Sequence, residues 1–202
     1  AEAAENGELQ NVIAAPCSSC DEGIRPGISL RLLERLPALV PGGRYVTAGT
    51  ACLTHDGAAF VVLCSLDYAR AHGLETAAVV EDVVSAGGIP ERSPESIIPA
   101  IDKLLRRSCL TADRITAWEC NEAFAVIDYL MEERFGQTGE RLNIFGGALA
   151  YGHPYGASGG IITLHLLEAL KKLDMPGQER HRYGVAAVAA AGGVGTAMLL
   201  RR

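Results

Sequence analysis

Residues 143–159 read Asn-Ile-Phe-Gly-Gly-Ala-Leu-Ala-Tyr-Gly-His-Pro-Tyr-Gly-Ala-Ser-Gly, a short apolar run followed by one histidine between glycine-bracketed turns. Glycine lacks a Cβ, so this backbone can bend tightly and approach a ligand closely. Pro154 restricts the chain directly after His153, which predicts an imidazole held on a stiff loop. An amphipathic helix is expected from about Ala157 to Leu173, with its N-terminal amides near the histidine. An isolated histidine is most often a surface or satisfied core residue, so the surrounding pattern must decide its role.

The composition is typical of a globular α/β protein. The chain has 202 residues, of which 49% are apolar and 23 are glycine, enough for one domain with a real core and a small appendage. The formal net charge is −6 and no basic block interleaved with aromatic residues occurs, so nucleic acid is not an expected partner. No apolar run reaches the ~18 residues of a membrane span and no signal peptide is apparent, so we expect no membrane association and a cytoplasmic location.

The six cysteines do not indicate a disulfide framework. Cys64, Cys109 and Cys120 fall in or beside apolar runs, as small core residues do. Cys17 and Cys20 form a C-x-x-C, which is compatible with a zinc or redox site. A zinc site would need a second pair of ligands at similar spacing, and none follows in the sequence. A structural coincidence or a flexible loop is therefore favoured, and no metal is expected.

Hydrophobic periodicity predicts alternating strands and helices, which is typical of a layered α/β sheet with mixed strand direction. The run Ala58–Cys64 is continuously apolar, as in a central strand covered on both faces. Other strands are expected at 44–49, 77–85, 115–119, 183–191 and 194–200, the last two as a hairpin, and helices at 29–39, 66–72, 94–107 and 121–135. The 77–85 segment has no decisive periodicity, and its valines favour a strand.

The loop Gly146–Gly159 resembles the GGA-A-GHP-GASG loop of thiolases, the acyl-CoA C-acyltransferases. Other stretches resemble thiolase motifs in the same order, and together they cover almost the whole chain. These are Asp21–Pro26 (DE-x-x-RP), Val46–Cys52 with Asp56–Ala59 (VTAGNAS and DGAA), Asn121–Ala125 (NEAFA) and Gly184–Ala197 (G-A-x-C-x-GGG-x-G-x-A). They match only the C-terminal half of a thiolase.

The resemblance implies a thiolase-like layered α/β fold with a five-stranded mixed sheet and helices on both faces. Residues 1–43 would form the end of the loop region that covers coenzyme A, and residues 44–202 would form the C-terminal domain. The implied activity is acyl transfer on acyl-CoA or another acyl thioester. Coenzyme A thioester is then the substrate, and no separate cofactor is expected.

Thioester chemistry needs a thiolate nucleophile, a base that generates the thiolate, and donors for oxyanions. His153 is suited to take the proton from a thiol because histidine titrates near neutral pH. Asn121 follows an expected strand and could present its amide to a water or a carbonyl oxygen. From the sequence alone an ordinary N-cap explains Asn121 equally well, and the resemblance favours the functional role. The resemblance also places substrate or coenzyme A contacts at Cys52, Gly152, Pro154, Gly156, Ala157 and Ser158.

The sequence departs from the thiolase pattern in the closing hairpin and in the upstream loop. The family's second cysteine, the acid/base for the α-carbon proton, is replaced by Ala189, whose side chain cannot transfer a proton. Ala191 replaces a glycine that supplies a backbone donor to an oxyanion; its N–H remains but its conformational freedom is smaller. Thr50 and Cys52 replace the Asn and Ser of the GNAS loop, which puts the usual pantetheine contacts in doubt.

The nucleophilic cysteine of thiolases belongs to the N-terminal half, and none of the six cysteines here lies in a C-[AG]-S-G-type turn. We therefore expect a partner chain that carries the N-terminal half, with the assembled pair forming a dimer of heterodimers or a homodimer. The alternative is a non-catalytic thiolase-like subunit that binds acyl-CoA or shapes a partner's site.

Overall fold

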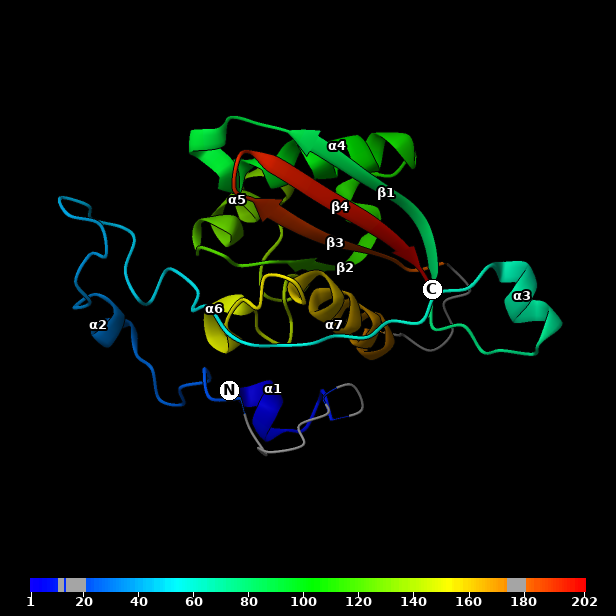
Figure 1. Ribbon diagram of the computed structural model, residues 1–202, viewed down its shortest axis with the longest axis horizontal. Helices are drawn as coiled ribbons and strands as arrows, with labels where there is room; N and C mark the ends of the chain where they lie inside the picture. Colours follow the sequence, from blue (N-terminus) through cyan, green and yellow to red (C-terminus); the bar gives the residue numbers. More distant parts are fainter. Residues whose placement is uncertain (11–12, 14–20, 174–180) are drawn as a thin grey trace.

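A four-stranded mixed sheet lies at the centre of the computed structural model, which describes residues 1–10, 13, 21–173 and 181–202 (Figure 1). The strand order is β1-β4-β3-β2; β2 and β3 are parallel, and β4 runs antiparallel to both of its neighbours. The strands are β1 (Val79–Gly87), β2 (Ile115–Cys120), β3 (Tyr183–Ala190) and β4 (Val194–Arg201). The expected α/β class and mixed strand direction are confirmed.

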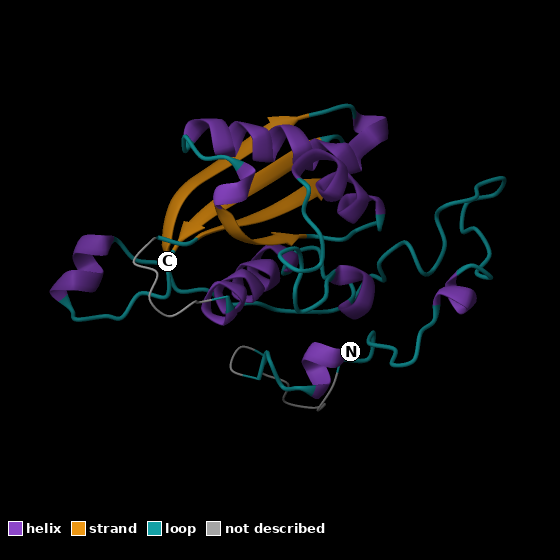
Figure 2. Ribbon diagram, turned by 180° about the vertical axis from the view of Figure 1, so that it is seen from behind, coloured by secondary structure: helices purple, strands orange, loops and turns teal. Residues whose placement is uncertain are grey.

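Helices cover both faces of the sheet (Figure 2). On one face lie α4 (Ile97–Arg107) and α5 (Val126–Phe135), and on the other lies α7 (Ser158–Lys172). The apolar residues of α4 recur at helical spacing, so its buried side faces the sheet. These buried residues are Ile97, Ala100, Ile101, Leu104 and Leu105. Each face thus has its own apolar core, one against α4 and α5 and one against α7.

The hairpin of β3 and β4 consists largely of small residues because other backbone passes very close to it. Gly195 lies against the 3-10 helix η1 (Pro90–Ser96), where an added Cβ would be 1.9 Å from Ser96 O. Gly193 lies similarly close to Gly88, whose N–H donates to Gly193 O at 2.6 Å. Gly193 and Gly195 of the thiolase-like hairpin motif therefore have a packing function in this chain.

Replacing Gly195 with alanine should destabilise the chain by roughly 2 kcal/mol or more, because backbone rather than a flexible side chain must move. Gly87 of β1 is the matched control, since it is also a strand glycine and an added Cβ there meets no atom within 4 Å. Denaturant unfolding of both variants measures the difference. Equal midpoints for the two variants would show that the η1 contact does not restrict Gly195.

The expectation of five strands is wrong for the described residues, which form four. Residues 58–64, expected as a central strand, belong to no strand, and Phe60, Val62 and Leu63 are 87%, 95% and 76% exposed. The segment runs along the outer side of α7, where a Cβ added to Gly160 would touch Ala59 (Figure 1). Because α7 separates the segment from the sheet, its backbone cannot pair there.

The remaining elements are short. They are α1 (Glu2–Glu5), α2 (Leu30–Leu33), α3 (Leu66–Ala71), the 3-10 helix η2 (Ala112–Arg114) and α6 (Ala148–Tyr151). Residues 44–49 form no strand, and only one bridge, Ala38 to Thr47, occurs there. Within the described ranges, no helix has the length and apolar character to cross a bilayer, and no cluster of three metal-ligating side chains occurs. Cys17 and Cys20 lie outside the described residues.

Candidate functional site

Three segments that are distant in the sequence, 50–53, 121–125 and 147–158, meet beyond the end of β2. Main-chain hydrogen bonds join the first segment to each of the other two, so the loops that carry Asn121 and His153 share one support. These bonds run from Cys52 N to Ala123 O (3.1 Å), from Ala125 N to Thr50 O (2.9 Å) and from His153 N to Leu53 O (2.7 Å).

The His153 ring is held at both nitrogens. Its Nε2 lies 3.2 Å from Asn121 Nδ2, and its Nδ1 lies 2.6 Å from Ser158 Oγ. The Ser158 hydroxyl donates its one proton to Pro154 O at 3.0 Å, so it can only accept from the ring. His153 therefore carries its proton on Nδ1 and presents the lone pair of Nε2 to the Asn121 amide.

The His153 side chain is 9% exposed, and burial lowers its pKa below the ordinary histidine value. The neutral ring therefore predominates at pH 7. The Tyr155 ring packs edge-on against the imidazole, with ring centroids 4.6 Å apart. A neutral, oriented imidazole with its lone pair on Nε2 is suited to accept a proton from a thiol that reaches this side of the ring.

Asn121 is not an N-cap, because α5 begins at Val126 and is preceded by the N-cap residue Ala125. The helix expected at 121–135 therefore starts five residues later. Asn121 is 1% exposed, and its N–H donates to Ala187 O of β3 at 3.0 Å. Its Oδ1 is buried without a hydrogen-bond partner among the described residues. This side chain is fixed beside His153 and keeps one unused acceptor there.

The expected coenzyme A contacts differ in accessibility. Gly152, Pro154, Ala157 and Ser158 are buried, Cys52 is half-buried, and Gly156 is exposed. Gly152 has φ 91°, and an added Cβ would lie 2.5 Å from the His55 ring. The turn before His153 thus requires glycine for both its conformation and its packing.

Ala189 and Ala191 lie at the end of β3 and the start of the following turn. Ala189 pairs with Gly195 of β4 and is half-buried against the α4 side of the core. Ala191 is exposed and does not have a positive φ, whereas Gly192 and Gly193 have φ 86° and 77°. Alanine at 191 is therefore compatible with the turn, because the left-handed conformations fall on the two glycines.

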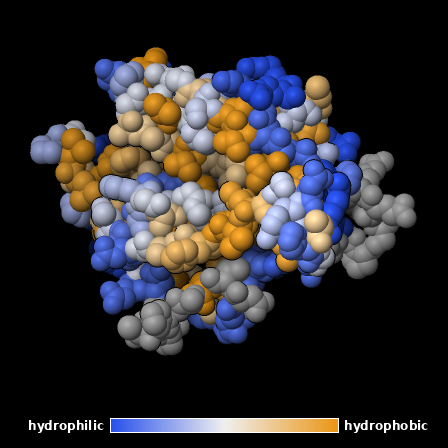
Figure 3. Space-filling model, turned by 45° about the vertical axis from the view of Figure 1, so that its right-hand side comes forward, coloured by the Kyte–Doolittle hydropathy of each residue, from blue (hydrophilic) through white to orange (hydrophobic). Residues whose placement is uncertain are grey.

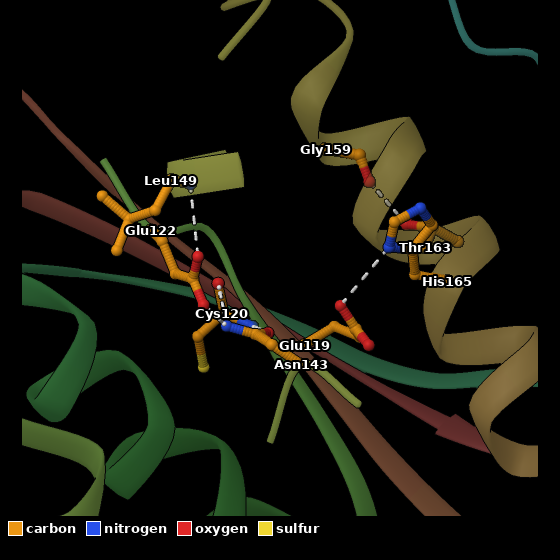
Figure 4. A network of polar contacts seen from close by, with 8 residues as sticks. All are labelled: Glu119, Cys120, Glu122, Asn143, Leu149, Gly159, Thr163 and His165. Atoms are coloured by element: carbon orange, nitrogen blue, oxygen red, sulfur yellow. Dashed lines mark hydrogen bonds and ion pairs between the residues drawn. The ribbon is translucent and has the colours of Figure 1, made fainter. Parts of the chain in front are cut away.

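Glu122 and Asn143 were not expected from the sequence to take part in the site, and they form a polar network behind it; Figure 4 draws both side chains. Asn143 Oδ1 accepts from Cys120 N at 2.8 Å, and its Nδ2 donates to Cys120 O at 3.0 Å and to Glu122 Oε1 at 2.7 Å. Asn143 is one of only two described non-glycine residues with positive φ. A carboxylate between Asn121 and the apolar residues Ala-Phe-Ala is the sequence signal that points to Glu122.

A second buried pair, Glu119 and His165, lies on the α7 side of β2 (Figure 4). His165 Nδ1 is 3.9 Å from Glu119 Oε2, and both side chains are at most 7% exposed. Burial, with a smaller contribution from the Glu122 charge, raises the pKa of Glu119, and burial lowers the pKa of His165 to about 4. His165 is therefore neutral near pH 7, and the contact with Glu119 is not an ion pair.

The chain belongs to the thiolase family, since residues 74–202 match the family described as "Thiolase, C-terminal domain". It is 37% identical over 182 residues to an acetyl-CoA acetyltransferase of Synechocystis sp., covering 90% of this chain and 44% of the relative. It is 38% identical over 184 residues to a β-ketoadipyl-CoA thiolase of Pseudomonas aeruginosa, covering 90% and 44%. The chain thus spans about half the length of these relatives, and the resemblance to a C-terminal half is confirmed.

Solved thiolase structures have the same fold. The Bacillus anthracis acetyl-CoA acetyltransferase superposes with a TM-score of 0.86 at 30% identity, over 99% of this chain and 52% of that chain. The human mitochondrial 3-ketoacyl-CoA thiolase in complex with CoA gives a TM-score of 0.83 at 28% identity, over 99% and 50%. The structural likeness thus extends beyond residues 74–202, which match the family model.

Proposed function

We propose that this chain is the C-terminal half of a thiolase-type acyltransferase that acts on acyl-CoA or other acyl thioesters. The nucleophilic cysteine would come from an N-terminal half, and the two halves together are called the assembled enzyme below. The observation that carries the proposal is the His153 ring, which is neutral and buried and has its Nε2 lone pair directed at Asn121.

In this reaction the cysteine thiol gives its proton to His153 Nε2, and the thiolate attacks the thioester carbonyl. The carbon–sulfur bond to coenzyme A then breaks, and the departing thiolate takes the proton back from the imidazolium. The Asn121 amide donates to the carbonyl oxygen or to a water beside it, and the N–H of Ala191 is proposed as an oxyanion donor. Ser158 keeps the ring in the Nδ1–H tautomer throughout.

Coenzyme A thioester is the proposed substrate, with no separate cofactor. Gly156 is the exposed member of the six proposed contacts and would form the rim of the pantetheine path with half-buried Cys52. Gly152, Pro154 and Ala157 would shape the wall of that path through their backbone. The buried Ser158 hydroxyl is already engaged with His153 and Pro154, so its contribution is the orientation of the ring.

The N-terminal half would cover the apolar segment 58–64. On the face seen in Figure 3, apolar side chains form contiguous patches among polar ones. In residues 58–64, Phe60, Val62 and Leu63 are largely exposed although the sequence there is typical of a strand buried on both faces. Because the chain spans about half of its relatives, we propose that a sheet in the missing half accepts this segment. The assembled pair would then dimerise.

Replacing Phe60 and Val62 together with aspartate should abolish association with the N-terminal half, because both side chains are exposed here and would be buried there. Tyr129 on α5 is a matched control, since it is 58% exposed on a helix against the other face of the sheet. Native mass spectrometry after co-expression with an N-terminal thiolase half, supplied as a second chain, measures the complex. Undiminished complex in the double variant would contradict this docking site.

The function is tested with the assembled enzyme by two assays. One measures exchange of the acyl group between acetyl-CoA and labelled coenzyme A, and the other measures thiolysis of acetoacetyl-CoA. Exchange should be readily detected. The alternative, a non-catalytic subunit that binds acyl-CoA, is favoured by Ala189 at the second-cysteine position, and it predicts binding of acetyl-CoA without either reaction.

A further inference from the structure

Glu122 directly follows Asn121 in the sequence, and its carboxylate reaches the glycine-rich turn that leads to His153. Leu149 N donates to Glu122 Oε2 at 3.3 Å, and Asn143 Nδ2 donates to Oε1 at 2.7 Å (Figure 4). Glu122 is 8% exposed, and a Cβ added to Gly147 would lie 2.2 Å from its Oε2. The turn can approach the carboxylate this closely only because residue 147 is glycine.

We infer that Glu122 is a positioning residue for the proposed acyl transfer. Its carboxylate links the Asn121 loop to the turn that carries His153, and the protonated Asp128 carboxyl stabilises this link. The inference rests on the proposed function. Asn121 and His153 must stay within hydrogen-bond distance, yet they come from segments joined mainly at residues 50–53 and through Glu122. Weakening the Glu122 contacts lets the two loops separate.

Asp128, on the first turn of α5, places a second carboxyl near that of Glu122, and its buried Oδ1 has no hydrogen-bond partner among the described residues. Burial and the Glu122 charge raise the pKa of Asp128 to about 7, so below that pH Asp128 carries a proton that it can donate to Glu122. Both residues line a cavity of about 460 Å³, which gives the proton a route to solvent.

Asp128 is the group near Glu122 whose loss of a proton can explain a change near pH 7. Burial and neighbouring carboxylates raise the pKa values of Cys120 on β2 and Tyr151 on α6 above their ordinary alkaline values, so both are neutral near pH 7. Burial also raises the pKa of Glu119 on β2. Glu132 and Tyr129 on α5 line the same cavity but are exposed. As pH rises above about 7, Asp128 loses its proton, two adjacent carboxylates repel each other, and the link between the loops weakens.

Two isosteric variants separate the parts of the inference. Glu122→Gln keeps the shape, but both described partners of the carboxylate are donors and an amide has one accepting oxygen. The amide nitrogen of the new glutamine must then face one of the two donors, Leu149 N or Asn143 Nδ2, and that hydrogen bond is lost. Asp128→Asn keeps a donor to Glu122 at every pH, because an amide does not titrate.

The experiment measures kcat and KM for acetyl-CoA/CoA exchange from pH 5.5 to 9 in the assembled enzyme and its variants. Glu122→Gln should lower kcat by ~10–100-fold with little change in KM, since a misplaced catalytic group reduces the rate more than binding. Asp128→Asn should keep the wild-type rate at pH 6.5 and lose the decline above pH 7. Glu132→Gln, in the same cavity, should change neither quantity.

Nitrogen NMR of His153 provides a readout independent of turnover, so a failure of this inference is distinguishable from a failure of the proposed function. Glu122→Gln should shift the His153 resonances and pKa in the intact protein, whereas Asp128→Asn should leave them at their values below pH 7. Wild-type kinetics and NMR for Glu122→Gln would overturn the positioning role. If Glu122→Gln does not fold, an unchanged alkaline decline in Asp128→Asn would still refute the role of Asp128.

Discussion

Replacing His153 with alanine should reduce acyl transfer by the assembled enzyme about 10³-fold or more, because the cysteine thiol loses the base that takes its proton. The ring links Asn121 Nδ2, at 3.2 Å, to Ser158 Oγ, at 2.6 Å, so its removal also takes this contact from both side chains. The affinity for acetyl-CoA should change much less than the rate. Exchange kinetics and equilibrium binding on the same preparation measure the two effects.

The controls for this variant use neighbours of the ring. Tyr155→Phe keeps the edge-on ring contact and should retain activity, because the Tyr155 side chain is 71% exposed and its hydroxyl takes no part in the mechanism. Ser158→Ala should cause a smaller loss than His153→Ala, since the ring remains but its tautomer is no longer fixed. A His153→Ala enzyme with unchanged turnover and altered affinity would instead support the non-catalytic subunit.

The pH dependence of the wild-type enzyme follows from the direction of the His153 shift. The neutral imidazole is the active form, and burial holds its pKa below the ordinary histidine value. Exchange should therefore persist as the pH is lowered through the usual histidine range and fall only below the folded-state pKa. A half-maximal rate above pH 6.5 on the acid side would contradict this environment for the ring.

The elements that could be predicted from the sequence are those whose structure is determined by residues close together in the chain. The helix expected from about Ala157 to Leu173 is found as α7, Ser158–Lys172, because its apolar spacing matches the helical period. The hairpin expected at 183–200 is found as β3 and β4, joined by Gly192 and Gly193 with positive φ. His153 could be singled out because glycines and Pro154 leave few other functions for the loop.

Features that depend on distant partners could not be predicted in the same way. The apolar run 58–64 indicates a segment to be buried, but whether it pairs depends on a sheet edge that the described residues do not offer. Asparagine is a preferred N-cap residue, but Asn121 forms hydrogen bonds with Ala187 and His153 instead, and the helix begins only at Val126. The hydrogen bonds of Glu122 could not be predicted from the sequence either, because its partners Leu149 and Asn143 lie 27 and 21 residues away along the chain.

Replacing Ala189 with cysteine should raise the rate of carbon–carbon bond formation at least ~10²-fold while leaving acyl exchange nearly unchanged. Condensation of two acetyl-CoA molecules requires removal of an α-carbon proton before the carbanion attacks the acyl-cysteine, and alanine offers no group for that step. Exchange between acetyl-CoA and coenzyme A needs only the nucleophile, His153 and the oxyanion donors. In the wild-type enzyme, exchange should therefore proceed much faster than condensation.

Ala190→Cys is the matched control for this substitution. Successive side chains of β3 point to opposite faces, so a thiol at 190 is one residue away but directed to the other side of the strand. Ala189 is half-buried and pairs with Gly195, and denaturant unfolding checks that the Ala189→Cys chain keeps the wild-type stability. Both rates are measured on one preparation of each variant, and their ratio does not depend on how much of the enzyme has assembled. A wild-type ratio already equal to that of Ala189→Cys would show that another group removes the α-proton, and Ala189 would then not limit the chemistry.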